Sequence, residues 1–126
     1  DRIDIHVEVP SVRYRDLAAR EVGEPSAAVK DRIERARGIQ KSRFPDDETL
    51  FNARLSDRQI QDLCHIDEDS RQLIEMAVDR LGLSARAHTR ILKVARTIAD
   101  LEGGPEIRPS HVAEAIQYRS LDCRLI

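Results

Sequence analysis

Residues 83–103 read LSARAHTRILKVARTIADLEG, and this stretch decides the fold. Its apolar side chains recur every three or four residues, which is the period of one face of an α-helix. Ser84 stands where it can cap the first turn of such a helix, and Gly103 is a natural C-terminal stop. The stretch therefore predicts the longest helix of the chain, with one face turned to a core. The predicted core face consists of Ala87, Ile91, Val94, Ala95, Ile98 and Leu101.

Three helices are predicted before this stretch, and the first two are expected to be capped by serines. Ser26 is the expected cap of a helix over residues 26–44, whose apolar stripe would be Val29, Ile33 and Ala36. Ser56 is the expected cap of a short second helix, because Gln59 three residues later completes a capping box. The inward side of that short helix would consist of Ile60, Leu63 and Cys64.

Two further helices complete the pattern. Asp67 is the expected cap of a helix that ends at Gly82, and Ser110 is the expected cap of a last helix that follows Pro109. Helices with short connections and almost no aromatic residues are typical of a helical bundle. We therefore expect an all-α domain, a bundle of four or five helices.

Residues 1–10 have a different period. Apolar side chains at Ile3, Ile5, Val7 and Val9 alternate with polar ones, which predicts a β-strand. A lone strand has no partner within the chain, so we interpret it as a piece of a sheet whose other strands precede Asp1. Residues 11–25 are then a linker, and residues 26–126 are the helical domain.

Composition narrows the class of function. The formal net charge is -2, so no bulk attraction to nucleic acid or to a membrane surface is expected. No apolar run is long enough for a membrane span. Cys64 and Cys123 lack metal-ligand spacing and are expected to be free thiols of a soluble, cytoplasmic protein. The four histidines form no metal motif either, so no metal site is predicted.

Arg86 is the residue that breaks a local rule. It lies in the first turn of the predicted helix over residues 84–102, where the helix dipole disfavours a cation. An arginine at this position can instead meet a phosphate, which the free backbone N–H groups of the first turn also favour. Arg90 and Lys93 follow on the same side of the helix. Spacing alone favours a solvated basic face for all three residues.

The residues quoted above resemble the C-terminal domain of the magnesium-chelatase-like ComM/YifB proteins. The likeness rests on residues 83–103, on residues 107–111 and 114–119 that follow, on the opening DRIDIHVEVP and on Asn52-Ala53-Arg54-Leu55. It covers nearly the whole chain. Proteins of this family are AAA+ ATPases, so the resemblance implies that residues 1–10 are the last strand of an ATPase core and that the helical domain is its lid.

The resemblance also implies residue roles. Arg2 resembles the arginine finger, which reaches the γ-phosphate bound by a neighbouring subunit, and Arg86 resembles the sensor-2 residue. ATP and Mg²⁺ would be the cofactors of a longer parent ATPase. Its partners would be its own upstream core, neighbouring subunits of a ring, expected to be a hexamer, and DNA. No GxxxxGK[ST] phosphate loop is present, so the chain alone is expected to be a monomer without catalysis and without a bound cofactor.

Three functions follow from these expectations. The first is the lid of a DNA-acting ring motor, of the kind that drives branch migration in natural transformation. The second is the lid of a porphyrin magnesium chelatase subunit. The third, which belongs to another class, is a stand-alone helical adaptor that binds a protein partner. The unpaired strand argues against the adaptor, because a self-contained module has no use for it.

Overall fold

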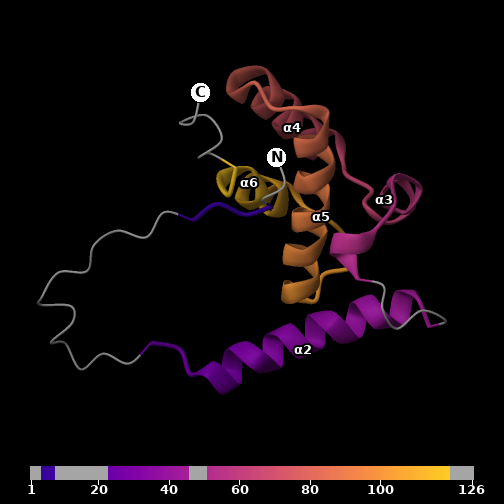
Figure 1. Ribbon diagram of the computed structural model, residues 1–126, viewed down its shortest axis with the longest axis vertical. Coiled ribbons are helices and arrows are strands. Elements are labelled where there is room, and N and C mark those ends of the chain that lie inside the picture. The colour runs from indigo at the N-terminus through magenta and orange to yellow at the C-terminus, as the bar shows by residue number, and fades with distance from the viewer. Residues whose placement is uncertain (1–3, 8–22, 46–50, 120–126) are drawn as a thin grey trace, which may run out of the picture.

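Helices make up all the regular structure that the computed structural model describes, which covers residues 4–7, 23–45 and 51–119 (Figure 1). This confirms the predicted all-α class. The elements are α2 (Ser26–Arg43), the 3-10 helix η1 (Asn52–Arg54), α3 (Asp57–Leu63), α4 (Glu68–Leu81), α5 (Ala85–Glu102) and α6 (Pro109–Gln117). None of these helices has an apolar stretch long enough to cross a lipid bilayer.

Helix α5 is the central element, and α2, α3, α6 and η1 all contact it (Figure 1). Ile91, Ala95 and Ala99 along it are fully buried. Side chains from α3, α4 and α6 complete the core around them: Ile60, Ile74, Val112 and Ala115. The predicted core face of α5 is therefore confirmed, except that Leu101 in its last turn is 42% exposed.

Three predicted helix starts are confirmed by their hydrogen bonds. The Ser84 hydroxyl accepts from the backbone N–H of Ala87, and the Asp67 carboxylate accepts from the N–H of Ser70 at 2.8 Å. Ser56 forms the expected capping box with Gln59. Helices α4 and α5 end at glycines in the left-handed conformation, Gly82 at φ 62° and Gly103 at φ 76°.

Two predicted caps are wrong by one or two residues. Helix α2 is capped by Pro25, whose carbonyl accepts from the N–H groups of residues 28 and 29, so Ser26 is already the first helical residue. Helix α6 is capped by Arg108, and Pro109 rather than Ser110 begins it. Proline is well suited to a first helical position, because that position needs no N–H donor and the ring already fixes a helical φ.

The predicted apolar stripe of α2 is only partly buried. Ala36 and Gln40 are its buried residues, whereas Ile33 is 48% exposed. Helix α2 therefore packs on α5 through its C-terminal half. Figure 1 shows the first half of α2 extending beyond the bundle.

The predicted strand over residues 1–10 is described only at residues 4–7, which form neither strand nor helix. A strand is defined by the ladder it forms with a partner, and the described residues offer none. Instead, the His6 N–H donates to the Tyr118 carbonyl at 2.8 Å, just beyond the end of α6. The rest of the predicted strand and residues 11–22 of the linker lie outside the described residues.

Candidate functional site

A pocket of about 450 Å³ lies beside the N-terminal half of α5. Three of its lining side chains are cations of α5, namely Arg86, Arg90 and Lys93. The remaining wall comes from α5 itself, from η1, from the start of α3 and from the N-terminal segment: Ala85, Thr89, Ala53, Asp57 and Asp4. Basic side chains thus gather where α5 begins.

The helical repeat explains why these three cations share a wall. Arg86, Arg90 and Lys93 are four and three residues apart, and this spacing places side chains on one face of a helix. The apolar side of α5 faces the core and fixes the rotation of the helix, so the basic side must face away from it. The first-turn N–H groups of α5 lie at the same end, where the helix dipole is positive.

Two of the three cations have partners in the structure. Arg90 forms an ion pair with Asp4, across 86 residues of sequence. The Lys93 ammonium donates to the Ala53 carbonyl in η1 at 3.2 Å. These contacts bring the N-terminal segment and η1 to the three cations of α5, so the pocket wall is assembled from distant parts of the chain.

The structure thus brings together more than the sequence predicted. Arg86 is exposed and lines the pocket. Arg90 and Lys93 were interpreted as solvated surface charges, but they line the same pocket and are only partly exposed. Their shared side was visible in the sequence, whereas the pocket wall supplied by Asp4 and Ala53 was not. Arg2, the expected arginine finger, lies outside the described residues.

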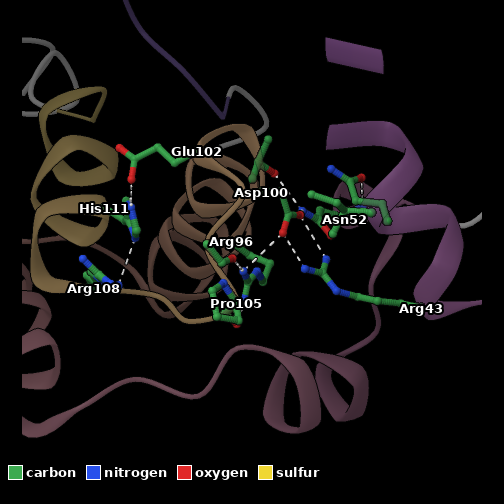
Figure 2. Close-up of polar contacts among 12 residues, drawn as sticks. Arg43, Asn52, Arg96, Asp100, Glu102, Pro105, Arg108 and His111 are labelled. Atoms are coloured by element: carbon green, nitrogen blue, oxygen red, sulfur yellow. Dashed lines mark hydrogen bonds and ion pairs between the residues drawn. The ribbon is translucent and has the colours of Figure 1, made fainter. Parts of the chain in front are cut away.

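A buried ionic network lies further along α5 and holds the bundle together. Figure 2 shows Arg43, Asn52 and Arg96 converging on the Asp100 carboxylate. The Asn52 side-chain N–H donates to Asp100 at 2.9 Å, and Arg43 donates to it twice, once at 3.0 Å. The Asp100 side chain has no exposure to solvent. One carboxylate therefore joins α2, η1 and α5.

The same network reaches the loop between α5 and α6. Arg96 lies 3.2 Å from Asp100 and donates to the backbone carbonyls of Gly104 and Pro105 at 3.0 and 3.1 Å. His111, in the first turn of α6, contacts both ends of this loop. Its Nε2 lies 2.6 Å from a Glu102 oxygen, and its Nδ1 accepts the Arg108 N–H (Figure 2). These bonds set the angle between α5 and α6.

Sequence reasoning missed this network. Arg96 and Asp100 are four residues apart on α5, and each directly follows a buried alanine, so an inward-facing charged pair was the available signal. The partners Arg43 and Asn52 could not be found from spacing, because they are 57 and 48 residues from Asp100. Asn52 also accounts for part of the 52–55 motif, since its backbone N–H and its side chain are both bonded.

Three pKa shifts mark the electrostatics of the helices. Burial raises the pKa of the Cys64 thiol to about 11, although nearby Arg96 partly opposes this. The pKa of Asp67 is lowered by its hydrogen bonds from Ser70, and that of Glu68 is lowered by Arg71. Cys64 is a free, buried thiol, while Cys123 lies outside the described residues. In the described part of the chain, no three His, Cys, Asp or Glu side chains are grouped as metal ligands.

Comparison with known proteins identifies the family. The family model described as magnesium chelatase, subunit ChlI C-terminal, matches residues 23–119. The chain belongs to this magnesium chelatase C-terminal family. The match includes all the described helices, the buried network and the basic side of α5. It begins three residues before α2, close to the predicted start of the helical domain.

Relatives of this magnesium chelatase C-terminal domain agree with the resemblance seen in the sequence. The competence protein ComM of Haemophilus influenzae is 39% identical over 96% of the chain, which is 23% of that protein. The YifB proteins of Salmonella typhimurium and Escherichia coli are 41% and 39% identical over 100% of the chain and 24% of their own length. The chain therefore spans about a quarter of the length of these relatives.

Proposed function

We propose that this chain is the lid of a AAA+ ATPase and that Arg86 contacts nucleotide phosphate at the start of α5. The observation that carries the proposal is the pocket in which Arg86, Arg90 and Lys93 meet beside a helix N-terminus. Guanidinium and ammonium groups form charge-assisted hydrogen bonds with phosphate oxygens. Backbone N–H groups of a first helical turn favour the same anion.

The residues present fit the phosphate end of ATP. The pocket is open to solvent at Arg86, and Thr89 adds a hydroxyl to the three cations. Bound ATP supplies the anionic phosphate. The accompanying Mg²⁺ would be bound by residues of the parent protein outside this chain, as the resemblance implies.

The expected role of Arg86 is that of a sensor. Its guanidinium holds the lid to a terminal phosphate, and it loses that bond when the phosphate leaves, so that the lid can turn relative to the ATPase core. Arg2 would stabilise negative charge at the nucleotide of a neighbouring subunit, as arginine fingers do. Asp4, two residues further along the chain, lies in the wall of the basic pocket, which supports a place for this segment near the nucleotide.

The test is Arg86→Ala in the full-length parent protein. A charge-assisted hydrogen bond contributes about 1.5–3 kcal/mol, so we expect nucleotide affinity to fall by roughly 10- to 100-fold and the ATPase rate to fall with it. Arg71→Ala is the matched control, because Arg71 is exposed on α4 and pairs with Glu68 away from the pocket. Unchanged affinity and rate in Arg86→Ala would refute the proposal.

The motor is proposed to act on DNA. Support comes from the similarity to ComM, which is named a competence protein. The description of the family favours a second candidate, a magnesium chelatase subunit that acts on a porphyrin. ATPase assays of the parent protein would separate them. Stimulation by branched DNA supports the first, and stimulation by porphyrin with partner subunits supports the second.

Ring assembly is part of the same proposal. The parent would form a ring, expected to be a hexamer, in which each lid rests on its own ATPase core. The isolated chain is expected to be monomeric and to release no phosphate from ATP. Light scattering and a malachite-green assay on the purified chain test both points. Phosphate release above the blank would contradict the second.

A further inference from the structure

Segment 4–7 touches two different cavities at once. At Asp4 it forms part of the basic pocket, and at Asp4, Ile5 and Val7 it lines a second cavity of about 370 Å³. The second cavity is mostly apolar and is lined on α5 by Val94, Ile98 and Leu101. Lys93 lies between the two cavities and lines both. A displacement of Asp4 would therefore alter both cavities together.

The Asp4 carboxylate already pairs with the Arg90 guanidinium, at the place where an anionic ligand would bind. A carboxylate and a phosphate present similar oxygens to a guanidinium, so both compete for the same fork of N–H donors. The Asp4 and Arg90 side chains are 47% and 24% exposed, so this pair is neither sealed off nor fully solvated. Such a pair contributes modestly to stability and can be exchanged for a more highly charged anion.

We propose that Asp4 is an internal competitor for the phosphate-bearing ligand of the basic pocket. Binding of the anion displaces the Asp4 carboxylate from Arg90 and releases segment 4–7 from α5 and α6. The hydrogen bond from the His6 N–H to the Tyr118 carbonyl then opens, and Ile5 and Val7, already 48% and 63% exposed, no longer line the second cavity. This inference rests on the proposed phosphate site and adds to it a link between the ligand and the segment that follows Arg2.

The first experiment measures the affinity of the 126-residue chain for inorganic tripolyphosphate at low salt, by calorimetry. Asp4→Asn removes the competitor, and we expect it to raise affinity about twofold to fivefold, the upper part of the range for a partly exposed ion pair. Asp57→Asn is the matched control, because it removes the same charge from the pocket wall. We expect Asp57→Asn to raise affinity less than twofold. Equal gains in the two variants would reduce the effect to general electrostatics and overturn the inference.

A second measurement locates the competition on Arg90. In an Arg90→Gln background, Asp4→Asn should gain no more than Asp57→Asn, because the displaced ion pair no longer exists. In the unmodified chain, saturation with tripolyphosphate should accelerate hydrogen exchange at the His6 amide by about tenfold or more. A His6 amide that exchanges at the same rate in the saturated chain would overturn the inference.

Arg86→Ala separates the two proposals. If Arg86→Ala leaves the affinity for tripolyphosphate unchanged while Asp4→Asn raises it, the role of Arg86 is refuted and the competition by Asp4 stands. Binding that needs Arg86 but responds equally to Asp4→Asn and Asp57→Asn refutes the competition alone. If no variant binds tripolyphosphate, both fail.

Discussion

At the scale of single residues, Asp100 has the most demanding environment. Its carboxylate is buried without solvent exposure and is held by Arg43, Asn52 and Arg96. A buried charge is tolerated only when partners replace the water it has lost. Removal of the carboxylate leaves two guanidinium groups with excess positive charge inside the bundle, which costs more than the lost hydrogen bonds alone.

Asp100→Ala is therefore expected to lower the free energy of unfolding by about 3–5 kcal/mol. Urea unfolding followed by circular dichroism measures this loss. Asp79→Ala is the control, because Asp79 is an exposed aspartate on α4, and it should change stability by about 0.5 kcal/mol or less. A loss below about 1 kcal/mol in Asp100→Ala would mean that the network contributes little.

Cys64 gives the fold a specific dependence on alkaline pH. The pKa of its thiol is about 11 in the folded chain against 9.0 as the ordinary value, because burial disfavours the thiolate. The protonated thiol is therefore fully compatible with the fold below pH 9, and stability is lost as pH rises from 9 towards 11. We compare the chain that carries Cys64 with its Cys64→Ala variant, both with Cys123→Ser and in reductant. The difference between their free energies of unfolding should shrink across this pH window. A constant difference between the two proteins in urea unfolding at pH 8.5 and 10.5 would contradict this.

Residue-scale features differ in how far the sequence predicts them. Arg86 could be singled out because a cation in a first helical turn breaks a rule that depends on neighbours alone. Asp100 could not be singled out with its partners, because the pairing with Arg43 depends on how α2 crosses α5. The pocket around Arg86 could not be predicted either, because Asp4 and Ala53 reach its wall only through tertiary packing. Local signals placed the three cations on one side of a helix, and tertiary packing supplied the rest of the pocket.

At the scale of elements, helix boundaries follow the hydrogen bonds of the first turn. Ser56 and Ser110 look alike in the sequence, since each precedes an apolar helical pattern. Ser56 is a true cap whose hydroxyl accepts from Gln59. Ser110 is the second residue of α6, because Arg108 and Pro109 have already begun that helix. A proline that precedes the serine therefore shifts the start of the helix towards the N-terminus.

Replacement by alanine is expected to have different effects at the two serines. Ser56→Ala should lower the free energy of unfolding by about 1 kcal/mol, because the Gln59 N–H in the first turn of α3 loses its partner, the Ser56 hydroxyl. Ser110→Ala should have an effect of about 0.5 kcal/mol or less, because Ser110 is exposed and caps nothing. Urea unfolding of both variants checks this. Equal losses would show that the start of α6 is placed wrongly.

At the scale of the whole molecule, stability is expected to be uneven. Helix α5 is surrounded by other elements and contains fully buried residues at 91, 95 and 99. The first ten residues of α2, by contrast, include none that is buried. Local opening costs least where few apolar contacts are lost. The bundle is thus expected to consist of a firm centre with one weakly held end.

Hydrogen exchange should resolve these regions. Backbone amides of residues 91–99 are expected to exchange only by global unfolding, whereas those of residues 30–35 should exchange at least about 100-fold faster. Residues 37–43 of the same helix are the internal control, because they lie next to the contacts with α5, and they should be intermediate. Uniform protection along α2 would contradict this expectation.

The attachment of α2 has a mechanical consequence. Its C-terminal half is fastened by Arg43 to Asp100, and residues 26–35 form a helical segment about 15 Å long beyond it. While that segment stays helical, a tilt of about 10° at the fastening moves its tip by roughly 3 Å. A displacement of roughly 3 Å at the tip is comparable in size to a change of side-chain conformation at the Arg43–Asp100 contact. Helix α2 therefore has the geometry of a lever, which turns small adjustments around Asp100 into larger travel at the end where residue 26 joins the preceding chain.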